Sequence, residues 1–530
     1  MLMISKKERH KIILSKFPGL IKFIKKIEVV IMSEAKKVSK TSPWYWFHAV
    51  VGLLIMIGFP QLGPFEPITE TGMWVAGILI GMVYLWSTLD SIWPSLLGLL
   101  LFALYSGYLG EEVTGYAAVK AVFLNAIGSD TVITVMLGMV LFGAVEYVGC
   151  TKYLARFFLT RKIITGRPYV FLFIVFFCSY FISGFTLAVA SLLILWPLML
   201  ESMAEFGIDK KNPIFWTSVF GIYLAATLGQ PMFPFKGAAL VVTGAFTKAT
   251  GVAVNYLAYI AYNFIMSLLL LIIFLLFVKF VLRPDVSKMK NVTPEQFNKN
   301  PLPPMNIQQK VMLLTCLIFI IVLLAPSFMP KTWALTQILN SYGTNGVLAM
   351  CIIVLMIARF EGKPMLPFKA VAKGSVSWDI IFLVAAAVYV CDAVATEQTG
   401  LKEFIVQMLT PLLGNKSPIV FVAILLLFAI ITTNFANNAG MATIIIPIAL
   451  AFQDMYPEVP MMAVCMSIGM MVFVALATPA ASPYCAMLHA QKDKITFKQI
   501  EICALPMCLI AWLAYSFLGY PLSTILFGGM

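Results

Sequence analysis

Residues 433–440 read TNFANNAG and residues 183–186 read SGFT, and each stretch interrupts an otherwise apolar segment. An apolar run containing a proline follows each interruption, with Pro447 in the second half and Pro197 in the first. Glycine and small polar residues at these points leave backbone amides and carbonyls without helical partners. A bilayer tolerates such backbone only where protein or a water-filled cavity surrounds it. Paired interruptions, one in each half of a chain, indicate the substrate site of a secondary transporter.

The composition indicates that lipid surrounds much of the chain. Of its 530 residues, 61% are hydrophobic and only 12% are charged. A soluble protein of this length could not bury that much apolar side chain. Since an apolar run of about 20 residues crosses a bilayer, about a dozen spans or half-spans can be placed. They begin near Trp44, Gly72, Ile92, Val132, Tyr169, Pro213, Tyr256, Val311, Val347, Ile380, Ile419, Met441, Met461 and Ile502. We therefore predict an all-α polytopic membrane protein.

The net charge of +13 fits basic residues held on the cytoplasmic side of a membrane. These residues lie in tails and short loops, so nucleic acid is not an expected partner. Residues 1–43 are predicted to form a basic amphipathic segment on the inner leaflet of the cell (plasma or inner) membrane, with the N-terminus in the cytoplasm. The nine cysteines have no metal-ligand spacing and are expected to be core residues, so no metal site is predicted.

A polar segment, residues 283–310, is predicted to be a cytoplasmic linker between two membrane repeats. The first repeat would occupy residues 44–282 and the second residues 311–530. Scaffold spans are expected at residues 44–109 and 311–359. The transport parts are expected at about residues 125–282 and 375–490.

Landmarks recur between the two halves at an offset of about 250 residues, which favours a duplication. Phe185 and Pro197 correspond to Phe435 and Pro447, and EYVG at residues 146–149 corresponds to EQTG at 397–400. We predict two inverted repeats, each with a re-entrant hairpin turning at Glu-x-x-Gly, then a broken helix, then a proline-broken element. Asp130 and Asp379 are expected to cap the first arms of these hairpins, with Glu146 and Glu397 near the tips.

Polar residues at the interruptions are candidates for the site, because intramembrane polar groups are costly. Amides, hydroxyls and freed backbone N–H groups can bind a carboxylate or sulfate, and freed carbonyls can bind a cation such as sodium. The alternative is that these side chains only join helices through interhelical hydrogen bonds. The predicted substrate-binding residues are Ser183, Gly184, Thr186, Lys236, Asn437, Asn438, Thr478 and Pro479. The predicted cation-binding residues are Thr433, Asn434, Asn438, Ala477 and Ser482.

Lys236 lies in the stretch GQPMFPFKG at residues 229–237, where prolines and glycines forbid a continuous helix. One interpretation places it at a membrane surface, with its ammonium reaching water. The other places it at the substrate site. There its ammonium would offset the charge of an anion, or take the electrostatic role that a bound sodium plays elsewhere.

This arrangement resembles the divalent anion:sodium symporter family, the dicarboxylate, citrate and sulfate carriers of the wider ion transporter superfamily. The resemblance covers most of the chain from about Trp44 and rests on the two interruptions and on residues 74–107, which include WSTLDSIWP at 86–94. Thr478-Pro479 and, less well, Gln230-Pro231 represent the Thr-Pro turns of that family. Its Ser-Asn-Thr signature is reduced to Asn437-Asn438-Ala439 in the second half and is replaced by Leu187-Ala188-Val189 in the first.

The resemblance implies an anion carrier with an elevator mechanism, a homodimeric scaffold and no cofactor, with sodium as one candidate coupling ion. Sodium symport is not safely implied, because the loss of the first signature, with a lysine nearby, favours anion exchange or a proton-linked or reduced-sodium mode. We predict a secondary active transporter of small divalent or organic anions: di- or tricarboxylates, or sulfate. The alternative is another carrier of the superfamily, for arsenite or for sodium/proton exchange. An enzyme is not expected, since none of the three histidines lies with acidic partners. A channel would favour continuous polar helix faces, which the chain lacks.

Overall fold

The structure, a computed structural model, describes residues 43–105, 115–236, 239–291, 302–327, 329–330, 332–435, 438–479 and 481–528. The predicted amphipathic segment before Pro43 lies outside the described residues. The chain divides into two compact units, Met1–Leu53 and Leu54–Met530. In the first unit, the described residues form α3 (Pro43–Leu53). All other elements belong to the second unit.

The second unit is built almost entirely of helices. Its first half contains α4 (Glu70–Thr88), α5 (Ile92–Leu104), α6 (Gly115–Ile127), α7 (Asp130–Tyr147), α8 (Cys150–Leu159), α9 (Pro168–Phe185), α10 (Ala188–Glu205), α11 (Pro213–Gly229), α12 (Ala239–Thr250) and α13 (Tyr256–Phe277). Its second half contains α14 (Ile307–Leu324), α15 (Ala334–Ile357), α16 (Phe368–Ser375), α17 (Trp378–Ala395), α18 (Leu401–Leu413), α19 (Pro418–Thr433), α20 (Asn438–Ala451), α21 (Met461–Met471), α22 (Pro483–Ala490), α23 (Phe497–Ala514) and α24 (Tyr520–Phe527). A short antiparallel pair, β1 (Arg359–Phe360) and β2 (Lys363–Pro364), follows α15.

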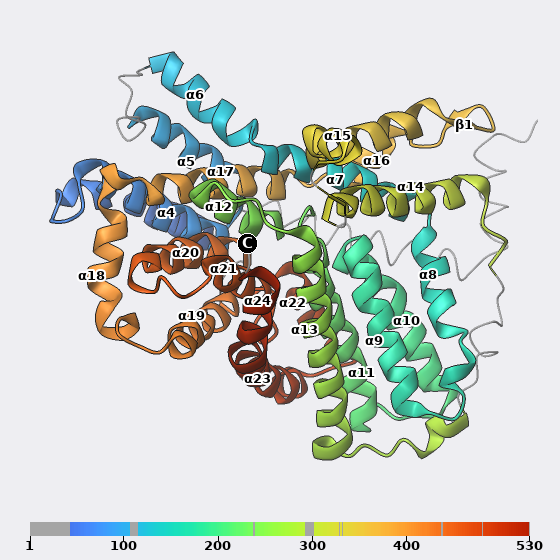
Figure 1. Ribbon diagram of the computed structural model, residues 1–530. Coiled ribbons are helices and arrows are strands. Elements are labelled where there is room, and N and C mark those ends of the chain that lie inside the picture. The colour runs from blue at the N-terminus through green and yellow to red at the C-terminus, as the bar shows by residue number, and fades with distance from the viewer. Residues whose placement is uncertain are drawn as a thin grey trace, which may run out of the picture. The chain divides into compact units, whose positions relative to one another are not determined.

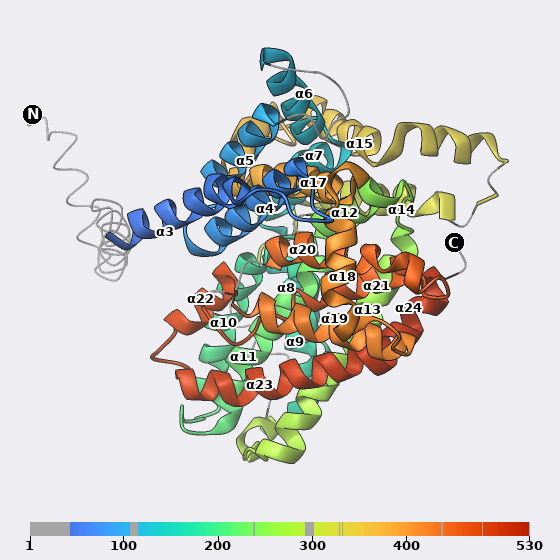
Figure 2. The same ribbon diagram turned by 90° about the vertical axis from the view of Figure 1, so that its left-hand side faces the viewer.

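Length and composition make this a membrane fold. Nine helices within the described residues are long and apolar enough to cross a bilayer, and two further bent pairs pass the same test. Figures 1 and 2 show α4, α5, α6, α15 and α17 as an upper layer, with α9, α11, α19 and α23 beneath it. Within the lower group, every residue of α11 from Ile214 to Gly229 is buried. The predicted fold class, an all-α polytopic membrane protein of two repeats with re-entrant hairpins and broken helices, is confirmed.

The re-entrant hairpins lie at the two interruptions. Along α9 and α10, the Ser179 and Ser191 hydroxyls are 2.8 Å apart, and the rings of Phe171 and Phe206 have centroids 6.5 Å apart. These contacts require α10 to run back along α9. Phe421, at the start of α19, stacks on Tyr456 beyond α20 at 4.3 Å, so the second pair folds back in the same way.

The Glu-x-x-Gly stretches are corners between helices, which corrects their predicted place at hairpin tips. Gly149 joins α7 to α8, and Gly400 joins α17 to α18 through a short 3-10 turn, η10 (Glu397–Thr399). Both glycines have positive φ, 75° and 64°. In Figure 1, α18 runs down from the end of α17, across the direction of α17. Sequence alone could not separate the two arrangements, because a corner and a hairpin tip both need glycine.

α7 and α17 are capped by serines, so the prediction of aspartate caps is wrong. The Ser129 hydroxyl accepts from the backbone N–H of Val132, and the Ser377 hydroxyl accepts from that of Ile380. Asp130 and Asp379 lie instead in the first turns of α7 and α17. An acidic side chain there is stabilised by the positive end of the helix dipole.

Gly400 permits a close contact between the corner and the start of α4. The Thr69 backbone N–H donates to the Thr399 carbonyl at 3.1 Å, and the Thr69 hydroxyl donates to the Gln398 carbonyl at 2.7 Å. A Cβ at position 400 would lie 1.9 Å from the carbonyl oxygen of Pro67. A side chain at position 400 would therefore collide with the Pro67 carbonyl and would also have to adopt an unfavourable positive φ.

We expect Gly400→Ala to lower the stability of the protein by about 1–3 kcal/mol or more, because a non-glycine residue held at positive φ alone costs that much. Thermal unfolding in detergent measures the change. Gly374→Ala is the matched control, since a Cβ at that helical position meets nothing within 4 Å. Equal unfolding midpoints for the two variants would contradict the account of this corner.

Candidate functional site

A cavity of about 440 Å³ lies between the two repeats. Its size is in the range of pockets that bind small organic molecules. The first repeat contributes polar side chains from the α9–α10 tip and from the break before α12. The second repeat contributes the start of α20, the break before α22, and the bend between α16 and α17. The polar and ionisable lining residues are Ser91, Ser183, Thr186, Gln230, Lys236, Ser375, Ser377, Asp379, Asn438, Ser482 and Tyr484.

Lys236 is the buried cation of this cavity. It follows the 3-10 turn η5 (Gln230–Met232), and its side chain is only 8% exposed. Its Nζ donates to the carbonyl oxygens of Ser183 at 3.0 Å and Gly184 at 2.7 Å, and to that of Thr186. An ammonium has three N–H donors, so these three bonds use all of them. The interpretation of Lys236 as a surface lysine is therefore wrong.

The three acceptors of Lys236 belong to the C-terminal end of α9 and the residue that follows it. The end of a helix carries partial negative charge on its unpaired carbonyls. The ammonium offsets the partial negative charge of that end, and the carbonyl oxygens stabilise the ammonium without removing its charge. The Phe142 ring lies 5.8 Å from Nζ, and Glu146 of α7 interacts with Lys236 electrostatically. This acidic partner is remote in the sequence and was not predicted.

The two hairpins are attached by equivalent hydrogen bonds. The Ser183 hydroxyl donates to the Ala226 carbonyl at 2.6 Å, and the Thr433 hydroxyl donates to the Val472 carbonyl at 2.5 Å. Thr433 also donates to Oδ1 of Asn438 at 3.1 Å, across the second interruption. Each hydroxyl thus joins the first arm of its hairpin to the helix that precedes the broken segment.

Asn434 organises the break between α21 and α22. Its Oδ1 accepts from the backbone N–H groups of Leu476 and Ala477, both at 2.8 Å, and its Nδ2 donates to the Val474 carbonyl at 3.2 Å. The Thr478 hydroxyl donates to the Asn434 carbonyl. His489 of α22 contacts the Ala477 carbonyl through Nε2 at 2.9 Å. The Asn434 amide is therefore already bonded to the backbone on both sides.

The structure brings some predicted residues into the cavity and leaves others beside it. Ser183, Thr186, Lys236, Asn438 and Ser482 line the cavity. Gly184, Thr433, Asn434, Ala477, Thr478 and Pro479 are not among its lining residues. Asn437 lies outside the described residues.

Five further lining residues were not predicted as site residues: Ser91, Gln230, Ser375, Ser377 and Tyr484. Asp379, predicted only as a helix cap, also lines the cavity. Gln230 alone had a signal in the sequence, namely its position before Pro231 in the broken segment.

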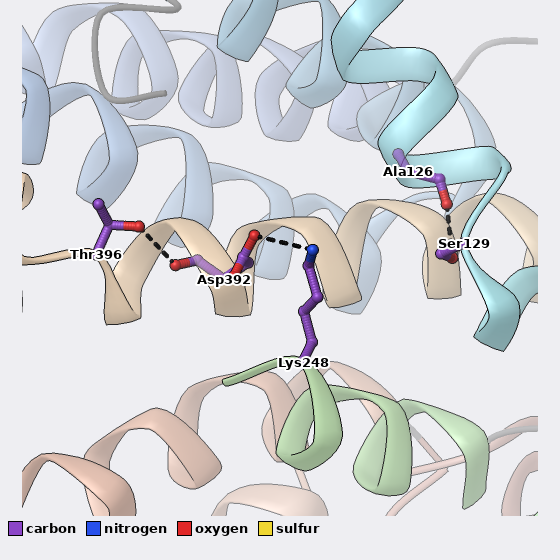
Figure 3. A network of polar contacts seen from close by, with 5 residues as sticks. All are labelled: Ala126, Ser129, Lys248, Asp392 and Thr396. Atoms are coloured by element: carbon purple, nitrogen blue, oxygen red, sulfur yellow. Dashed lines mark hydrogen bonds and ion pairs between the residues drawn. The ribbon is translucent and has the colours of Figure 1, made fainter. Parts of the chain in front are cut away.

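An ion pair joins α12 of the first repeat to α17 of the second. Lys248 Nζ lies 3.4 Å from Asp392 Oδ2, and the Asp392 carbonyl accepts from the Thr396 hydroxyl at 3.0 Å. Figure 3 shows this pair, with the Ser129–Ala126 hydrogen bond of the α6–α7 turn close by. Both charged side chains are nearly half exposed, so the pair contributes about 0–1 kcal/mol. The ion pair shows that α12 and α17 lie in contact, but it adds little to the stability of that contact.

Residues 81–469 match the sequence model of the citrate transporter family, CitMHS. This match spans well over half of the chain. The chain belongs to the citrate transporter family. The membership agrees with the predicted resemblance to carriers of the ion transporter superfamily. As a citrate transporter family member, the protein is a multi-pass membrane carrier, and both family and fold point away from an enzyme.

The chain is similar in sequence to two relatives. A protein of Methanocaldococcus jannaschii described as the uncharacterized transporter MJ0672 is 26% identical over 178 residues, which cover 34% of this chain and 38% of that protein. The aligned part is thus little more than a third of that relative. A protein of Cupriavidus necator described as a membrane protein is 20% identical over 491 residues, 89% of this chain and 90% of its own. The solved structure of the YdaH transporter of Alcanivorax borkumensis is similar with a TM-score of 0.49 and 15% identity, covering 89% of this chain and 99% of that chain.

Proposed function

We propose that this citrate transporter family member is a secondary active transporter of small organic anions with two or three carboxylates, with sulfate as a smaller candidate. One observation carries the proposal. A single cavity is lined by polar side chains of both repeats and by one buried ammonium, that of Lys236. The description of the matching family as citrate transporters supports the same class of substrate.

Lys236 would contribute charge to binding without donating to the substrate, because its three N–H groups are bonded to carbonyl oxygens. Charge acts at longer range than a hydrogen bond and is screened less in a buried site than in water. Direct donors would come from Asn438 and Ser482, which line the same cavity. The proposed substrate site therefore combines one fixed cation with neutral donors.

We propose that the first repeat has no place for a coupling sodium. Sodium prefers oxygen ligands, and the carbonyls freed at the end of α9 are occupied by the ammonium. In the second repeat, the Asn434 amide is bonded to the backbone through both its oxygen and its nitrogen. Anion exchange or a proton-linked mode is thus favoured over sodium symport. The proposed cycle is an elevator movement in a homodimer in the cell (plasma or inner) membrane, with the N-terminus in the cytoplasm.

Uptake into proteoliposomes tests this proposal. We expect saturable uptake of labelled citrate, succinate or malate at equal rates in sodium and in potassium, with counterflow when the same anion is loaded inside. The same assay with labelled sulfate tests whether the smaller anion is also a substrate. Liposomes without protein provide the background. Uptake that requires a sodium gradient would contradict the proposed coupling. Uptake that does not saturate would contradict the proposal that the protein is a carrier.

A sodium/proton exchanger is the second candidate, and one observation favours it. Asp379 places a carboxylate at the cavity, and a sodium/proton exchanger needs an acidic group beside its ion path. Sodium pulses applied to proteoliposomes that contain a pH-sensitive dye distinguish the two functions. We expect no sodium-driven pH change, and a sodium-driven change without anion uptake would favour the exchanger.

A further inference from the structure

Gln230 lines the cavity but has no part in the proposed contacts with Lys236, Asn438 and Ser482. It follows α11, whose last turn is buried, and it begins η5 beside Pro231. The backbone cannot continue as a regular helix there, because Pro231 has φ −84° and ψ 18°. The break thus places a primary amide against the cavity, next to the segment that carries Lys236.

The Gln230 side-chain nitrogen is buried and has no hydrogen-bond partner among the described residues. A buried N–H donor without a partner is unfavourable, and native proteins rarely keep one without a reason. Two other polar groups of the same repeat at this cavity are already bonded within the protein. The Ser183 hydroxyl is bonded to a backbone carbonyl, and so is the Lys236 ammonium. The side-chain N–H of Gln230 is therefore available to donate to a group that enters the cavity.

Asn438 contributes a second amide to the same cavity from the opposite repeat. The Thr433 hydroxyl donates to its Oδ1, which leaves the Nδ2 side of that amide as the donor side. Two amides on elements from different repeats suit an anion with two acceptor groups. A single carboxylate would satisfy one of them and leave the other unpaired.

We propose that Gln230 is a specificity-determining residue that donates to a second carboxylate of the substrate, while Asn438 donates to the first. The proposal rests on the proposed function and deepens it. It states that the site selects anions with at least two carboxylates over monocarboxylates of equal length. The selection comes from the Gln230 donor, which only an anion with a second carboxylate can pair.

Binding to the purified full-length protein tests this role, with succinate and butyrate as probes. The two anions have the same chain length and differ in one carboxylate. We expect Gln230→Ala to weaken succinate binding by about 10- to 100-fold, the usual cost of a lost hydrogen bond to a charged group, and to leave butyrate binding unchanged. Gln230→Glu keeps the shape and replaces the donor by a carboxylate, so it should weaken succinate further. Gln407→Ala, on the exposed part of α18, is the matched control and should behave as wild type.

The measured quantity is the ratio of succinate affinity to butyrate affinity. If Gln230 had a purely structural role, Gln230→Ala would leave this ratio unchanged. A structural defect weakens both anions alike, whereas loss of a carboxylate contact weakens succinate alone. An unchanged preference in Gln230→Ala would overturn the inference while the proposed function stands. Failure of the wild-type protein to bind citrate or succinate would overturn the proposed function, and this inference with it.

Discussion

Replacing Lys236 by alanine should abolish anion transport in potassium medium. The change leaves the Ser183, Gly184 and Thr186 carbonyls without their donor in a buried site and removes the one cation of the cavity. Removing one partner of a buried charged arrangement lowers stability by about 3–5 kcal/mol, and the anion also loses the positive charge that offsets its own. Uptake into proteoliposomes measures the effect.

The vacated carbonyls should then accept a small cation. We expect Lys236→Ala to be more stable to heat in sodium than in potassium, and any residual uptake to become sodium-dependent, because a ligand that binds only the folded state raises its stability. Lys248→Ala is the matched control, since that lysine forms a half-exposed ion pair and should matter little. Normal transport by Lys236→Ala in potassium would show that the proposed role of this ammonium is wrong.

Asn438→Ala is the second substitution with a large expected effect. We expect affinity for a dicarboxylate to fall by about 10- to 100-fold, because a hydrogen bond from an amide to a carboxylate contributes about 1.5–3 kcal/mol. Membrane insertion and the unfolding temperature should change little, since Thr433 keeps its bond to the Val472 carbonyl. Competition with labelled substrate measures the affinity.

The control for this variant is Asn340→Ala, an asparagine on the exposed side of α15. It should retain wild-type affinity. If Asn438→Ala itself bound the dicarboxylate with wild-type affinity, the proposed contact between Asn438 and the substrate would be wrong. An equal loss of folded protein and affinity would instead assign Asn438 a structural role.

The sequence predicted the repeats well because their landmarks are backbone constraints. Pro168 and Pro418 start the first arms of the hairpins, and Pro197 and Pro447 lie inside the second arms. Proline and glycine restrict φ whatever surrounds them, so they mark breaks before any contact is known. The span start predicted near Val347 falls just after Gly343, whose φ of 58° and ψ of −174° break α15. The part of α15 before this break was not predicted.

The direction of the chain after each break could not be read from the sequence. A helix that continues and a helix that folds back both need small or polar residues at the interruption. The choice is made by contacts between the arms, such as Phe171 with Phe206 and Phe421 with Tyr456. These aromatic pairs follow the duplication, but only the structure shows that they touch.

The partners of the site residues were also beyond the sequence. Lys236 could be assigned to a broken segment, but its bonds to the end of α9 depend on packing between elements more than 50 residues apart. Gln230 was noted only as a weak counterpart of a Thr-Pro turn, and its unpaired nitrogen becomes visible only when the neighbouring atoms are placed. Composition could indicate polar breaks, but the pairing of each polar group is a property of the fold.

A structure of the full-length protein at high resolution with citrate or succinate bound, determined in potassium without sodium, tests the central claim most directly. We predict the anion in the cavity between the two repeats, within hydrogen-bond distance of Asn438, with the Lys236 ammonium still on the carbonyls of Ser183 and Gly184. An anion bound elsewhere, or a cavity that stays empty at saturating anion, would contradict the account.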